Sequence, residues 1–214
     1  SQRFLELEEK MKMEINSCNT YSKIINIGCV NCIYNCHLKP HISQLMNKHT
    51  NICLNVILDH SRHLLNRLHD NSIDVCFSYL ATNEISYKCI PYKTDEIIFV
   101  TNSQNIQFSN GIHNGEILHL PIIYSKFMPK SGFDWIHDIF PPHYVFQFTI
   151  SVIKEIIPFL LQYPYYAFLP RKLIEKELKD GLLIEIPLLD YHIPPLQSYI
   201  IMKSNAKYNP LDYF

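Results

Sequence analysis

The chain has 214 residues, of which 47% are hydrophobic and 18% are charged, with only 5 glycines and 13 prolines. This composition excludes a disordered or fibrous chain and predicts a packed globular protein of one or two domains. Its 19 Lys and Arg residues nearly balance 20 Asp and Glu residues. No broad positive field therefore favours nucleic acid or an anionic membrane.

Segments that would cross or target a membrane are not visible. The longest uncharged apolar stretch, residues 156–170, is interrupted by Pro158 and Pro164 and is too short to span a bilayer. The N-terminus is charged, lacks a signal-peptide pattern and begins without Met, so we expect a fragment of a longer protein. Seven cysteines at irregular spacing indicate reduced thiols. We therefore expect a cytoplasmic protein that contacts no membrane.

The first part of the chain alternates between helix and strand patterns. Residues 3–15 carry apolar side chains at spacings of three and four, which predicts an amphipathic helix. Strands are then predicted at residues 24–29, 52–58 and 73–79, with helices at 38–49 and 61–69. Short connections between such elements predict a parallel, doubly wound sheet.

The pattern changes at two extended runs, residues 86–92 and 96–100, which have no helix between them. A second α/β series follows, with strands predicted at 122–124, 144–148, 165–169 and 198–202, and helices at 117–119, 133–139, 152–161 and 173–178. Two similar α/β lobes in one chain usually carry a ligand cleft between them. The expected fold class is α/β, with two Rossmann-like lobes and a central cleft.

Five segments, in order and spacing, carry a resemblance to a known family: KIINIGCV, HLKPHISQLMNKHTNICLNVIL, LLNRLHDNSIDVCFSYL, DEIIFVT and YYAFLPRKLIEKELKDGLLIEIPL. Over most of residues 3–203 the chain resembles the effector-binding domain of LysR-type transcriptional regulators. The short matching motifs are Ile27-Gly28, Leu38-x-Pro40, Ile73-Asp74-Val75 and Leu169-Pro170. Two departures are Thr50-Asn51 in place of a turn proline, and bulky Tyr163-Pro164-Tyr165 where the family usually has Gly-x-Gly.

The resemblance implies a type 2 periplasmic-binding-protein-like fold. Residues 1–16 would end a linker helix, residues 17–101 plus 196–214 would form lobe I, and residues 102–195 would form lobe II. Such a domain binds a small-molecule effector between its lobes, and the resulting closure controls transcription without catalysing a reaction. DNA would be contacted only through a winged helix-turn-helix upstream. The alternative from another class is the solute-binding receptor of a transporter.

The resemblance also implies a homodimer or higher homo-oligomer. In this arrangement the helices predicted at residues 38–49 and 152–161 would pack side by side across a twofold axis. The second helix is almost entirely apolar after Glu155, which is more than burial against one sheet face requires.

Candidate effector-binding residues lie in the strand-to-helix turns, where unpaired backbone N–H groups suit a carboxylate or other anion. In the first lobe they are Val30, Asn31 and Cys32 after the first strand, and Ser61 after the second. By the resemblance, the others are Ser125, Lys126, Thr149 and Ser151, with Thr101 at the crossover and Tyr166 narrowing the opening. Lys126 is their only cation, which favours an anionic effector. For Ser61 and Ser151, simple N-capping explains the sequence equally well.

The sequence Cys29-x-x-Cys32-x-x-x-Cys36-His37 contains residue types that zinc or an iron–sulfur cluster would require. Packing is the better interpretation, because Cys53, Cys76 and Cys89 also fall in predicted strands. No metal or cofactor is therefore expected. The histidines, including three on the helix at 61–69, are interpreted as solvated. No nucleophile signature or glycine-rich loop indicates catalysis.

Overall fold

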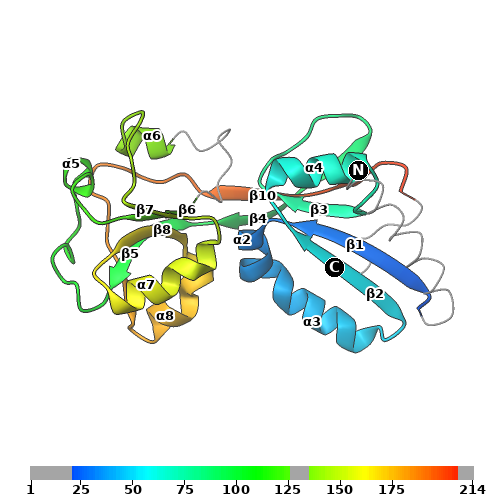
Figure 1. Cartoon of the computed structure of the whole chain (residues 1–214), viewed down its shortest axis with the longest axis horizontal. Helices are drawn as coiled ribbons and strands as arrows, with labels where there is room; N and C mark the ends of the chain where they lie inside the picture. The colour runs from blue at the N-terminus through cyan, green and yellow to red at the C-terminus, as the bar shows by residue number, and fades with distance from the viewer. Residues whose placement is uncertain (1–20, 126–134, 207–214) are drawn as a thin grey trace. The chain divides into compact units, whose positions relative to one another are not determined.

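The computed structural model describes residues 21–125 and 135–206 (Figure 1). The helix expected at residues 3–15, and with it the linker assignment of residues 1–16, lies outside the described residues. The chain forms two compact units: unit 1 comprises Ser1–Pro91 and Tyr199–Phe214, and unit 2 comprises Tyr92–Ser198. The chain leaves unit 1 within β4 (Tyr87–Asp95) and returns within β10 (Leu196–Lys203).

These boundaries differ from the predicted ones at residues 101 and 195. The reason is the pairing of β5 (Ile97–Asn102), which forms hydrogen bonds with two strands of unit 2, β8 (Tyr166–Pro170) and β9 (Leu183–Glu185). An apolar run indicates a strand, but its pairing partners are decided by tertiary contacts.

Unit 1 contains a five-stranded sheet in the order β2-β1-β3-β10-β4. The three predicted strands are confirmed as β1 (Lys23–Cys29), β2 (Ile52–Leu58) and β3 (Val75–Ser78). β1 pairs in parallel with both β2 and β3, whereas β10 pairs antiparallel with β3. The sheet is therefore mixed, with the predicted parallel arrangement at one end.

A polar ladder fixes the register of the parallel strands. The backbone N–H of Asn26 donates to Asp74 Oδ2 at 2.7 Å, and Asn55 Nδ2 donates to Asn26 Oδ1 at 2.9 Å. Asn26 and Asn55 are also register partners in β1 and β2. Because a slip by one residue would turn these polar groups to the other face, the ladder selects one register.

Helices lie on both sides of the unit 1 sheet (Figure 1). One helical stretch follows β1 and comprises α2 (Asn31–Ile33), the π-helical turn η1 (Tyr34–Leu38) and α3 (Lys39–Lys48). It begins earlier than the predicted residue 38, because Pro40 marks only the first turn of α3. The second predicted helix is confirmed as α4 (Ser61–His69), which buries Leu64 and Leu68.

In unit 2, β5 pairs antiparallel with β8 and β9. Two further strands, β6 (Ile123–Ser125) and β7 (Phe148–Ile150), pair in parallel. A single bridge between Ile122 and Tyr166 joins β6 to β8. The sequence did not predict β9, and the second lobe is not a simple parallel sheet.

The strand predicted at residues 144–148 is wrong, since β7 begins only at Phe148. The aromatic side chains before it form a cluster instead. The ring of Phe146 stacks on Tyr124 at 4.3 Å and meets Phe140 edge to face at 4.9 Å. Tyr144 Oη donates to the carbonyl of Leu118 at 3.0 Å. Aromatic residues favour strands in general, but here packing on neighbouring rings prevails.

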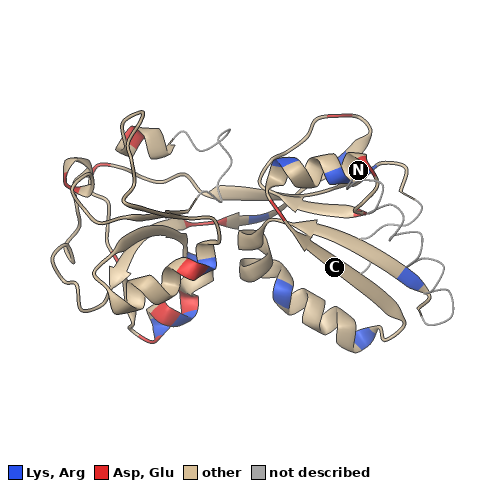
Figure 2. Cartoon of the chain, in the orientation of Figure 1, with Lys and Arg blue, Asp and Glu red and all other residues tan. Residues whose placement is uncertain are grey.

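The helices of unit 2 are short: α5 (Asn114–Ile117), α6 (Trp135–Ile139), η2 (Ile153–Glu155), α7 (Ile156–Gln162), η3 (Arg171–Ile174) and α8 (Glu175–Lys179). Charged residues of both signs lie close together on the ribbon of α8 (Figure 2), where Lys172 and Lys179 both donate to Glu175. Within residues 21–125 and 135–206, no helix has the length and apolar character needed to cross a membrane.

Candidate functional site

The carboxyl ends of β1, β2 and β3 meet at one edge of the unit 1 sheet, because the strands are parallel. Backbone hydrogen bonds tie their turns together: Val30 N donates to Phe77 O at 3.1 Å, and Asp59 N donates to Cys29 O at 3.2 Å. In open α/β sheets ligands bind outside this edge of the strands. The predicted residues Val30, Asn31, Cys32 and Ser61 all lie here.

Ser61 links two of these turns. Its Oγ accepts a hydrogen bond from the backbone N–H of Tyr79 at 3.3 Å, and the residue is 6% exposed. The N-cap of α4 is His60, which has no capping bond from its side chain. Ser61 therefore does not act as the N-cap. The turn after β3, which begins at Tyr79, also belongs to this edge. It was not among the predicted site residues, although the end of the third parallel strand indicated it.

At the end of β1, only some of the predicted groups can reach a ligand. Asn31 is half-buried, and its carbonyl and Oδ1 both accept from Asn35 Nδ2, at 2.9 and 3.2 Å. The side chains of Val30 and Cys32 are buried. Residues 31–33 form the first turn of a helical stretch, where backbone N–H groups lack an intrahelical acceptor. At Cys32, only the backbone N–H is therefore placed to face a ligand.

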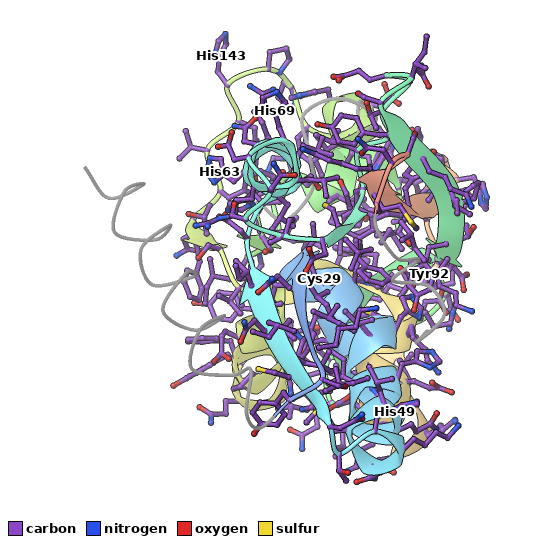
Figure 3. The ribbon with its side chains drawn as sticks, turned by 90° about the vertical axis from the view of Figure 1, so that its right-hand side faces the viewer. Cys29, His49, His63, His69, Tyr92 and His143 are labelled. Carbon is purple, nitrogen blue, oxygen red and sulfur yellow. The ribbon has the colours of Figure 1, made fainter. Side chains whose placement is uncertain are left out.

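Asp59 brings negative charge to the same edge. Its Oδ1 accepts from the backbone N–H of His60 at 2.7 Å and contacts the His63 ring at 3.0 Å, and Arg67 is close to its second oxygen. Partial burial raises the pKa of Asp59, but these hydrogen bonds and positive charges together lower the pKa below its usual value. Asp59 is therefore a paired carboxylate. His63 and His69 project outward from α4 (Figure 3), in line with the predicted solvated histidines.

The second candidate edge is formed by β6 and β7 in unit 2. Their parallel register places Tyr124 beside Thr149 and Ser125 beside Ile150, so Ser151 lies just beyond the edge. Ser125 is 4% exposed, and its Oγ has no hydrogen-bond partner among residues 21–125 and 135–206. Burial raises the pKa of its neighbour Tyr124.

Other predicted residues of unit 2 differ in accessibility. Thr149 and Ser151 are exposed, so these positions can accept larger side chains, whereas buried Ser125 cannot. The N-cap of η2 is Val152, so Ser151 does not cap this helix. Lys126 lies outside the described residues.

Thr101 and Tyr166 form part of the unit 2 core. Thr101 is fully buried, and its Oγ1 donates to Tyr165 O at 2.8 Å and accepts from Asn105 Nδ2 at 3.1 Å. Tyr166 is 2% exposed and stacks on Phe99 at 5.5 Å. Burial raises the pKa of Tyr166, with a smaller opposing effect of a hydrogen bond from Asn105. We assign both residues a structural role in place of the expected ligand contacts.

The six described cysteines of unit 1 form no disulfide with one another, and four of them are buried. Cys29, Cys32 and Cys36 are 0 to 5% exposed, and burial is the main cause that raises the pKa of Cys29 well above its usual value. Among the described residues, no three His, Cys, Asp or Glu side chains are placed to hold a metal ion.

Two α/β units joined by two crossings of the chain, with strand ends available for a ligand, define the class of type 2 periplasmic-binding-protein-like domains. The family described as the LysR substrate binding domain matches residues 19–211. The chain therefore belongs to this family, and the resemblance inferred from the sequence is confirmed. Its function is that of a ligand-sensing regulatory domain of LysR-type transcription regulators, rather than that of a transporter receptor.

Solved structures show the same fold at low sequence identity. A cysteine-to-serine mutant of OxyR from Corynebacterium glutamicum, bound to H2O2, is 17% identical with a TM-score of 0.64, over 96% of this chain and 67% of that chain. CrgA from Neisseria meningitidis is 12% identical with a TM-score of 0.70, and the match covers 95% of this chain and 70% of that chain. The BenM effector-binding domain with its effector benzoate is 17% identical with a TM-score of 0.63, and the match covers 90% of this chain and 89% of that chain. No curated protein sequence matches the chain.

Proposed function

We propose that this domain binds a small-molecule effector at the strand-end edges described above, and that binding controls a linked DNA-binding domain. The observation that carries the proposal is the buried, unpartnered hydroxyl of Ser125 at the end of β6, as found among the described residues. Buried polar groups are nearly always paired, so a polar atom of the effector is the expected partner. Asn31, Ser61, Thr149 and Ser151 are further proposed contacts.

The proposed effector is small and carries a carboxylate or a comparable hydrogen-bond acceptor. The first turns of α2 and α4 offer backbone N–H groups, and the carboxylate of Asp59 at this edge is already paired with His63. Lys126 follows Ser125 directly in the sequence and would add positive charge. Benzoate, the effector in the BenM structure, is an example of this chemistry.

We further propose a cytoplasmic protein that catalyses no reaction and contacts DNA only through another domain. None of the six described cysteines is in a disulfide, as expected in a reducing compartment. An effector shifts the equilibrium between two states of the domain only because it binds one state more tightly than the other. The coupling free energy between effector binding and this change of state is typically ~1–3 kcal/mol.

A thermal-shift comparison of benzoate with the uncharged amide benzamide tests the effector proposal. A carboxylate bound at 100 times its dissociation constant should stabilise the domain by about 2.7 kcal/mol, whereas an amide of the same shape should give a much smaller shift. A panel of small aliphatic and aromatic carboxylates extends the test. Equal shifts with acids and amides would contradict an anionic effector.

We also propose that the domain forms a homodimer through α3 and α7. Each helix keeps a large apolar side chain partly exposed, Met46 at 43% and Leu161 at 37%. Met46→Asp combined with Leu161→Asp should convert a dimer into a monomer in light scattering, because a charge is costly in an apolar interface. Leu182→Asp is the matched control, since Leu182 is 46% exposed but lies outside both helices. A wild-type monomer at high concentration would refute the proposal.

A further inference from the structure

Two thiols of unit 1 are in contact. Cys32 in α2 and Cys36 in η1 lie about one helical turn apart, with their Sγ atoms separated by 3.9 Å. Cys29, at the end of β1, is buried beside this stretch (Figure 3). The proposed effector contacts use none of these sulfur atoms.

The geometry of the pair favours a bridging atom over a direct disulfide. Side chains four residues apart in a helix have Cβ atoms about 5–6 Å apart, whereas a disulfide requires roughly 3.5–4.5 Å. A disulfide between Cys32 and Cys36 would therefore require the helical backbone to move. Two sulfurs bonded at about 2.3 Å to one central atom, with an angle of about 95–110°, lie roughly 3.4–3.8 Å apart. This spacing is close to the observed 3.9 Å.

The surroundings limit which atom can bridge the thiols. Among the described residues no third ligand completes a metal site, and Ile33 and Leu38 in the same helical stretch are fully buried. A zinc ion held by two thiolates would keep two open coordination positions in this apolar environment. A trivalent arsenic atom that carries one organic group requires only two sulfurs, and the product has no charge to bury.

We propose that Cys32 and Cys36 form a dithiol site that chelates a monosubstituted trivalent arsenical. In the reaction of an arsine oxide, two S–H bonds break and two As–S bonds form. The oxygen leaves as water with both protons, and arsenic remains trivalent, so no oxidant is needed. Because both thiols are buried, chelation follows local opening of the π-helical turn and is slow.

Intact-mass spectrometry of the reduced 214-residue chain with phenylarsine oxide tests this site. After a wash with excess glutathione, which removes single-thiol adducts, we expect one phenylarsenic group per folded chain and reversal by dimercaptopropanol. Cys32→Ala and Cys36→Ala should each lower the labelled fraction at least tenfold. Cys53→Ala is the matched control, since this half-buried cysteine lies in β2 and should leave labelling unchanged.

Peptide mapping of the wild-type adduct locates the arsenic without any variant, so the test does not depend on the variants folding. Arsenic on other cysteines, labelling retained in both alanine variants, or labelling only of the urea-unfolded chain would each overturn the proposal. A rapid Cys32–Cys36 disulfide under dilute H2O2 would also contradict it. Because the readout is mass, the result is independent of the carboxylate tests of the proposed function.

Discussion

Gly28→Ala is expected to destabilise the domain by roughly 1–3 kcal/mol, the usual cost of overpacking a core. A Cβ at this position of β1 would lie 2.4 Å from Ile73 Cδ1 and 2.9 Å from Leu64 Cδ2. Both side chains are buried, at 2% and 0% exposure, so neither can move without disturbing its own packing. Urea unfolding measures the loss.

Two further variants show whether this contact is the cause. Gly115→Ala adds the same methyl group in α5, where nothing lies within 4 Å, and should be neutral or stabilising by about 0.5–1 kcal/mol. Ile73→Val removes the Cδ1 atom and should therefore recover part of the stability lost in Gly28→Ala. Strictly additive effects of the Gly28 and Ile73 substitutions would refute the predicted clash.

Ser125→Ala should abolish or weaken the effector response at least tenfold, about 1.4 kcal/mol of binding energy, without lowering the stability of the free domain. The free energy of unfolding of the free domain should even rise by roughly 1–3 kcal/mol, because the substitution removes a buried hydroxyl that has no partner among the described residues. Thermal denaturation with and without a carboxylate that stabilises the wild type measures both effects.

Ser198→Ala is the matched control for this substitution. Ser198 is fully buried, but its Oγ donates to Lys93 O at 2.8 Å and accepts from Lys93 N at 3.2 Å. Its loss should lower stability by about 1–2 kcal/mol and leave the effector response intact. If Ser125→Ala instead behaves like Ser198→Ala, the hydroxyl of Ser125 is structural and the proposed edge of unit 2 is wrong.

Local sequence patterns predicted most strands and helices of this domain. The β-branched runs of β1 and β2 favour strands, and the leucine spacing of α4 buries Leu64 and Leu68 on one helical face. The pattern failed at residues 144–148, where the aromatic rings of Tyr144 and Phe146 pack on each other at 5.0 Å in irregular structure.

The candidate site was predicted less completely than the fold. Sequence order located the ends of β1, β2 and β6, because a strand that leads into a helix places its last residues at the ligand-binding edge. It could not distinguish the exposed hydroxyl of Thr149 from the buried hydroxyls of Thr101 and Ser125. Thr101 belongs to the core because its partners, Tyr165 and Asn105, come from other parts of the chain.

The sequence by itself determined the family and the order of the α/β elements, since both depend on local periodicity and on short motifs such as Ile27-Gly28. Only the tertiary structure decided the sheet to which β5 belongs, the side chains that a Cβ at position 28 would meet, and the contact between Cys32 and Cys36. These features depend on distances between side chains and strands brought together by folding, and such distances are set by the packing of the whole unit rather than by neighbouring residues.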